Sequence, residues 1–112
     1  NELPESLRGR WVRALADLRV ARLLAYRAVS LQHDPAAPAA ASSARIATTT
    51  CDQTVAELLF DVLGAGALDS GPGSALDGAV DDHWRYAQAA TVASGTIEVQ
   101  RMVVARDVLG GR

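Results

Sequence analysis

The sequence contains no lysine, a single cysteine and five aromatic residues among its 112 positions. Because Cys51 has no second cysteine to pair with, a disulfide within the chain is excluded and apolar burial must stabilise the fold. All eleven basic residues are arginines, and thirteen acidic residues bring the formal charge to −2. Such a balance lacks the strongly basic face that nucleic-acid binding requires. We therefore predict no nucleic-acid partner.

Long apolar runs are also missing, because arginine, aspartate or other polar residues interrupt every candidate. A membrane-spanning helix needs roughly 18 or more consecutive apolar residues. The chain also lacks the charged and then apolar beginning of a secretory signal. We therefore predict no membrane partner and a cytoplasmic location.

Apolar residues make up 49% of the chain, and most of them are Ala, Val and Leu. In two long stretches, about 5–32 and 38–64, they recur every three to four residues, which is the helical period. The expected apolar stripe of the first stretch runs through Leu7, Trp11, Leu15, Leu18, Ala21 and Ala25. Prolines separate the two stretches, and Gly64 and Gly66 end the second.

The second half of the chain alternates a loop with shorter helices. Residues 69–79 hold three glycines and a proline without an apolar period, which predicts a surface loop. A short helix is expected from 81 or 82 to 90, and a last helix from about 96 to 109. We expect its buried side to carry Ile97, Val99 or Met102, Val103 and Val108. The fold class is therefore an all-α, antiparallel helical bundle with three long helices and a short one.

Common catalytic motifs such as C-x-x-C, H-E-x-x-H and G-x-S-x-G are absent from the sequence. His33 and His83 are far apart, and each is interpreted as a solvated side chain near a helix end. The pair Asp81 and Asp82 is interpreted as a complement to a helix dipole, and no metal site is predicted. The stretch LGAGAL, 63–68, follows a helix and not a strand, so it marks a helix end.

The segment ASGTIEVQRMVVARDVLG, 93–110, places small residues directly before a helix start, where free amide groups favour negative charge. It resembles the C-terminal signature of the flavin-dependent acyl-CoA dehydrogenases, in which a glutamate precedes Gly-Thr and the end reads Ala-Arg-x-x-Leu-Gly. The matching positions are Gly95, Thr96, Gln100, Arg101, Ala105, Arg106, Leu109 and Gly110. The stretch 15–28 also looks like a helix of that domain, and the helix ending at Gly64 corresponds to one that usually closes in Gln-x-x-Gly-Gly.

The resemblance implies that residues 1–112 are one partial domain of a longer bacterial protein with further N-terminal helical and middle β domains. It implies an oxidoreductase of fatty acid metabolism that uses FAD for the α,β-dehydrogenation of an acyl-CoA thioester. A carboxylate would remove the α-proton while a hydride passes to the flavin. The expected partners are acyl-CoA and further acyl-CoA dehydrogenase subunits, in a homo- or hetero-oligomer. This chain alone is not expected to be active.

The resemblance also assigns roles to particular residues. Gly95 would approach the thioester of the substrate. The residues that would lie along the FAD are Thr96, Ile97 and Glu98. Asp61 and Gly64 would face the adenosine part of the FAD held by a neighbouring subunit. The apolar faces of the first and last helices would be buried between subunits.

Two departures from the family pattern bear on the activity. Ser94 occupies the usual position of the glutamate base, and a serine hydroxyl is too weak an acid to replace it. Asp61 and Ala65 replace the family glutamine and second glycine, which places a repelling carboxylate near phosphate. Three explanations are open: the base lies on an upstream helix outside this chain, the subunit is non-catalytic and paired with a competent one, or the activity is lost. We favour the non-catalytic subunit. The alternative function is a stand-alone helical assembly module without catalysis.

Overall fold

The computed structural model describes residues 3–93 and 95–110. Within these ranges it contains no strand and the following α-helices: α1 (Glu5–Ser30), α2 (Ala37–Leu63), α3 (Ala79–Ala89) and α4 (Ile97–Val108). The expected all-α bundle is confirmed. The first two helices have 26 and 27 residues, whereas α3 has 11 and α4 only 12. None of the helices in the described ranges combines the length and the apolarity needed to cross a bilayer.

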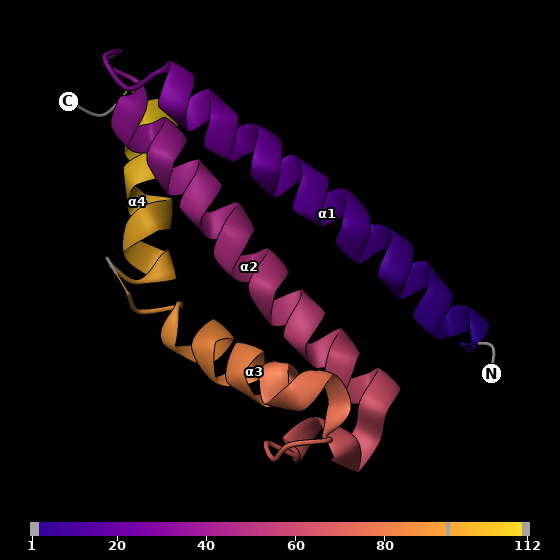
Figure 1. The fold of residues 1–112 in the computed structure, drawn as a ribbon. Helices are drawn as coiled ribbons and strands as arrows, with labels where there is room; N and C mark the ends of the chain where they lie inside the picture. Colours follow the sequence, from indigo (N-terminus) through magenta and orange to yellow (C-terminus); the bar gives the residue numbers. More distant parts are fainter. Residues whose placement is uncertain (1–2, 94, 111–112) are drawn as a thin grey trace.

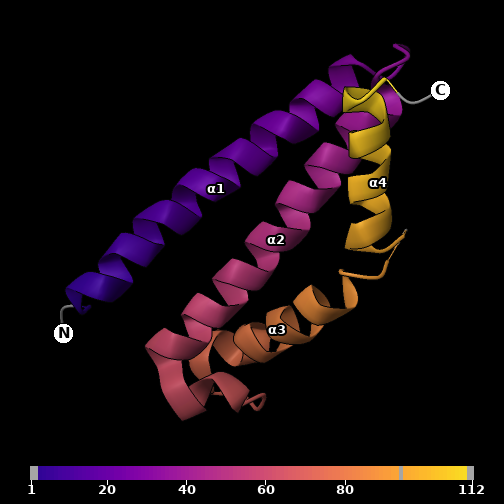
Figure 2. The same ribbon diagram turned by 180° about the vertical axis from the view of Figure 1, so that it is seen from behind.

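Helix α2 lies in the middle of the molecule, which measures 52 × 28 × 22 Å (Figure 1). The view from behind confirms that α1 runs antiparallel along one side of α2, while α3 and α4 follow each other along the opposite side (Figure 2). The rings of Phe60 and Trp84, with centroids 4.7 Å apart, join the last part of α2 to α3. Helix α4 packs against the first part of α2, near Pro38. Helix α2 is therefore covered from two sides.

The side chains that α2 buries are small over most of its length. The buried residues of this helix are Ala39, Ala40, Ser42, Ala44, Thr49, Cys51, Ala56 and Leu58. Small residues at a contact allow two helix axes to approach closely. The prediction that Cys51 is a small packed residue is confirmed, because it is buried in this set.

The helix ends follow the local chemistry of the sequence. Between α1 and α2, the carboxylate of Asp34 accepts a hydrogen bond of 2.8 Å from the amide of Ala36, which closes a turn ahead of Pro38. Gly64 ends α2 with φ +58, a conformation in which a side chain is strained. The hydroxyl of Thr96 accepts a 3.3 Å hydrogen bond from the amide of Val99 and caps α4.

The connection between α2 and α3 is more ordered than the loop predicted for 69–79. It contains two 3₁₀ helices, η1 (Gly64–Leu68) and η2 (Ala75–Gly78). In η2 both Leu76 and Asp77 have positive φ values near 50°, which is uncommon for residues with side chains. Gly78 follows with φ +83, and a Cβ there would lie 3.0 Å from the carbonyl oxygen of Ser70, so a side chain at this position would be both strained and crowded. This segment therefore forms short 3₁₀ turns although its sequence has no apolar period that would predict them.

The predicted buried faces of α1 and α4 are partly wrong. In α1 the fully buried residues are Ala14 and Ala21, whereas Leu15 and Leu18 are about half exposed. In α4 none of the predicted residues is fully buried: Val99, Met102 and Val108 are exposed, and Ile97 and Val103 are half-buried. Within the described ranges each of these helices packs mainly against α2, and one main neighbour covers only a narrow stripe of a helix.

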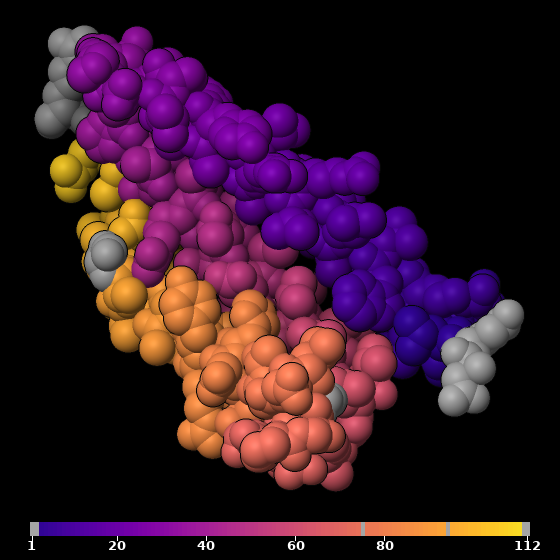
Figure 3. Space-filling view, in the orientation of Figure 1, coloured from indigo at the N-terminus to yellow at the C-terminus, as the bar shows by residue number. Residues whose placement is uncertain are grey.

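Helix α1 therefore forms one long edge of the molecular surface (Figure 3). Its exposed apolar side chains are Val12, Leu15, Leu18, Val20, Leu23, Tyr26 and Val29. A surface with this many apolar side chains on one helix is typical of a contact region. Burial of this face between subunits stays a prediction.

Candidate functional site

A polar hollow of about 380 Å³ lies where the turn after α3 leads into α4. Its lining residues are Thr50, Gln53, Thr91, Val92, Thr96, Ile97, Glu98 and Arg101. The structure thus brings Thr96, Ile97 and Glu98, which the sequence resemblance selected, together with Thr50 and Gln53 of α2. No local motif marks these two α2 residues, so the sequence alone did not predict them. Ser94, the residue at the position of the usual base, lies outside the described residues.

The backbone at Gly95 explains the spacing of two signature residues. Gly95 has φ +102, and a Cβ at this position would lie 3.0 Å from Nε2 of Gln100. The side chain of Gln100 therefore folds back toward Gly95, so that the glycine and the glutamine occupy adjoining space. A glycine here satisfies both the backbone conformation and the close approach of the glutamine.

The first turn of α4 presents backbone amide groups at the hollow. The hydroxyl of Thr96 accepts from the Val99 amide, and the carbonyl of Thr96 accepts from the Gln100 amide at 3.0 Å. The amide groups of Ile97 and Glu98 have no carbonyl acceptor within the helix because they lie in its first turn. They can therefore donate to water or to a ligand. The positive end of the helix dipole adds to the attraction for an electron-rich atom.

The second predicted contact region, Asp61 and Gly64, lies apart from the hollow. Asp61 lies eight positions after Gln53, which corresponds to about 12 Å along α2. Nη1 of Arg10 on α1 lies 2.5 Å from Oδ2 of Asp61, and both side chains are about half exposed. The sequence alone gives Asp61 an uncompensated charge, whereas the fold supplies a counterion from 51 positions away. Gly64 is exposed, with open space around its α-carbon.

The two histidines and the pair Asp81 and Asp82 do not form a common site within the described residues. His33 is exposed, as expected, but His83 is half-buried with its Nε2 3.2 Å from the carbonyl oxygen of Asp52, so the solvated interpretation is wrong for His83. Asp81 is buried and its Oδ2 lies 3.0 Å from Nε of Arg85. In the described ranges, no three His, Cys, Asp or Glu residues come close enough to hold a metal ion.

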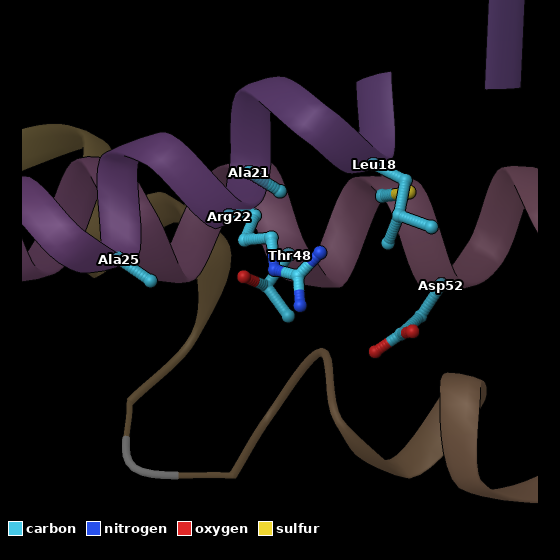
Figure 4. A pocket seen from close by; sticks show the side chains of 7 residues that line it. Leu18, Ala21, Arg22, Ala25, Thr48 and Asp52 are labelled. Atoms are coloured by element: carbon cyan, nitrogen blue, oxygen red, sulfur yellow. The ribbon is translucent and has the colours of Figure 1, made fainter. Parts of the chain in front are cut away.

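A second hollow, of about 420 Å³, lies between α1 and α2 (Figure 4). Four of its lining residues belong to α1, among them Arg22, whose side chain lies beside Thr48 of α2. Burial raises the pKa of the Cys51 thiol in its wall, and the negative charges of Asp52 and Asp17 raise it further. A thiol with a raised pKa remains protonated at neutral pH and is a poor nucleophile. The thiol in this hollow is therefore a weak candidate for a reactive group, and the hollow at α4 is the better candidate for a functional site.

The profile of the acyl-CoA dehydrogenase C-terminal domain matches residues 5–109. The chain therefore belongs to the acyl-CoA dehydrogenase family, and its described helices form the C-terminal helical domain. A similar solved structure is the crystal structure of the ChsE4-ChsE5 complex from Mycobacterium tuberculosis, with a TM-score of 0.84 and 32% sequence identity. The match covers 97% of this chain but 29% of that chain, so this chain spans less than a third of its length. No curated protein sequence matches the chain.

Proposed function

We propose that the chain is the C-terminal domain of a longer, cytoplasmic, FAD-dependent acyl-CoA dehydrogenase-like protein of bacterial fatty acid metabolism. The observation that carries this proposal is that Thr96, Ile97 and Glu98, within the segment that resembles the family signature, line a hollow of about 380 Å³. A hollow of this size is within the range of small-molecule sites. N-terminal helical and middle β domains would supply the remaining walls of the active site.

The residues at the hollow suit a flavin and an acyl-CoA thioester. Gly95 has no side chain, so a ligand can approach its backbone closely. The first-turn amides of α4 can donate to an electron-rich ligand atom. Thr50 and Gln53 add hydrogen-bonding groups from the opposite wall. FAD, when bound, would supply the oxidising chemistry.

Asp61 and Gly64 would contact the adenosine part of an FAD held by a neighbouring subunit. Their distance from the hollow supports two separate contact regions. Because Arg10 pairs with Asp61, this carboxylate repels a phosphate less than an isolated one does. The pairing therefore reduces the conflict between Asp61 and a bound nucleotide, and Gly64 leaves its backbone accessible.

The subunit is proposed to lack the usual base. Among the described residues that line the hollow, Glu98 carries the one carboxylate, and it lies in the first turn of α4 where it complements the helix dipole. Ser94 cannot serve as the base without an activating neighbour. We favour a non-catalytic subunit paired with a competent one, and the solved relative, which is a two-component complex, supports this arrangement.

The test uses the protein at its native length, with the subunits that purify with it. We expect the complex to show the visible absorbance of a bound flavin and to reduce a dye in the presence of an acyl-CoA. Ser94→Glu in this subunit should leave the turnover unchanged, as should the matched control Ser94→Gln. A complex without flavin or acyl-CoA oxidation would contradict the proposed function. Turnover gained by Ser94→Glu alone would contradict the non-catalytic assignment.

The second candidate is the stand-alone helical assembly module. It is favoured by an apolar groove of about 420 Å³ along α1, lined by Trp11, Val12, Ala14, Leu15, Leu18 and Val55. The length of the native polypeptide separates the two candidates. A native mass close to the 11.7 kDa of this chain supports the module. A much larger polypeptide with a β-rich domain supports the dehydrogenase.

A further inference from the structure

Arg45 of α2 joins the central helix to the turn that precedes α4. Its Nη2 donates a 2.9 Å hydrogen bond to the carbonyl oxygen of Ala90 and a second one to the carbonyl oxygen of Ala93. Ala90 is buried and caps the C-terminal end of α3, whereas Ala93 lies two positions before Gly95. One half-buried guanidinium thus holds the end of one helix and the approach to the next.

These two hydrogen bonds are of a strong kind. Carbonyl groups at a helix C-terminus have no partner within the helix and carry partial negative charge. A charged guanidinium donor makes stronger hydrogen bonds than a neutral donor. The hydroxyls of Thr91 and Thr96 bond within the turn and its adjoining helices, to Gln88 and Val99. Arg45, in contrast, reaches the turn from α2.

We propose that Arg45 is a positioning residue for the hollow at α4. Its guanidinium sets how far the turn stands from α2, and so places Gly95 and the first-turn amides of α4 opposite Thr50 and Gln53. Arg45 is not among the residues that line the hollow, so any effect on a ligand must pass through the turn. The consequence for FAD and acyl-CoA rests on the proposed function, whereas the anchoring of the turn does not.

The experiment compares three variants in the native-length protein with its copurifying subunits. Arg45→Gln removes the charge and the two-carbonyl contact. Arg45→Lys keeps the charge but not the planar donor group. Arg19→Gln, at an exposed position of α1, is the matched control for the loss of an arginine. Amide hydrogen exchange of residues 91–99 measures the anchoring, while flavin retention and the affinity of the complex for acyl-CoA, measured by titration, report its consequence.

We expect Arg45→Gln to raise the exchange rate of the hydrogen-bonded amides in this segment, those of Thr91, Val92 and Val99, roughly 10- to 100-fold, as the loss of a charged hydrogen bond implies. The amides of α1 should keep their rates, and Arg45→Lys should recover part of the protection. Flavin retention should fall, and the complex should bind acyl-CoA more weakly. If Arg45→Gln does not fold, Arg45→Lys alone should still raise exchange in 91–99 and not in α1.

Unchanged exchange in 91–99, or an equal change in Arg19→Gln, would overturn the positioning role. Faster exchange in a complex whose unmodified form binds neither FAD nor acyl-CoA would support the positioning role and reject the proposed function. Faster exchange with unaltered flavin retention and acyl-CoA affinity would restrict the role of Arg45 to the fold and overturn its link to the ligand.

Discussion

Replacement of Gly95 by alanine tests whether the turn before α4 depends on a backbone that only glycine adopts easily. The φ value of +102 lies outside the small left-handed region open to other residues. Such a conformation costs about 1–3 kcal/mol for a residue with a side chain. The added Cβ would also lie 3.0 Å from Nε2 of Gln100, a flexible side-chain end that can shift. We therefore expect Gly95→Ala to lower the free energy of unfolding by about 1–3 kcal/mol.

The matched control is Gly66→Ala. Gly66 has no positive φ, and a Cβ there would meet nothing within 4 Å. We expect this change to be neutral or to stabilise by up to about 1 kcal/mol, since alanine restricts the unfolded chain. Urea unfolding followed by helical circular dichroism measures both variants, with the midpoint expected to fall for Gly95→Ala at an unchanged slope. Equal midpoints for the two variants would refute the argument that the turn requires glycine.

Two further predictions concern the core. Leu58 is 1% exposed and is the largest fully buried side chain of the described residues. Leu58→Ala should therefore lower the free energy of unfolding by about 2–5 kcal/mol, as measured by urea unfolding. A loss no greater than that caused by Leu23→Ala, at an exposed position, would contradict the core role of Leu58. Because the raised pKa of Cys51 keeps the folded thiol protonated while the unfolded thiol ionises near its ordinary value of 9.0, stability should fall as pH rises above 9.0. Cys51→Ala should remove that part of the pH dependence, and an unchanged profile would show that other groups cause it.

The part of the candidate site that the sequence predicted is contiguous in the chain. Gly95 and Thr96 adjoin the start of α4, so a local motif is sufficient to select them. The capping hydroxyl of Thr96 and the positive φ of Gly95 are local properties that the types of these residues indicate.

Other parts of the site depend on contacts between distant segments. Thr50 and Gln53 lie more than 40 positions from α4, and nothing in their local sequence distinguishes them from other polar residues of a helix. Arg45 is likewise one of eleven arginines until the fold shows which carbonyl groups it reaches. The pairing of Arg10 with Asp61 also requires α1 and α2 to lie antiparallel.

The sequence by itself determined the helices and their approximate ends, because these follow from the apolar period and from capping chemistry. It also determined the glycine and threonine that directly precede α4 and the family resemblance, because short motifs reveal both. Only the tertiary structure decided which face of each helix is buried. Where the apolar stripe of a helix is wider than the part that the packing helix covers, side chains such as Leu15 and Met102 remain exposed. The apolar period of the sequence does not show how much of the stripe will be covered. The tertiary structure also decided which polar groups meet, because a hydrogen bond between distant residues depends on how whole helices pack.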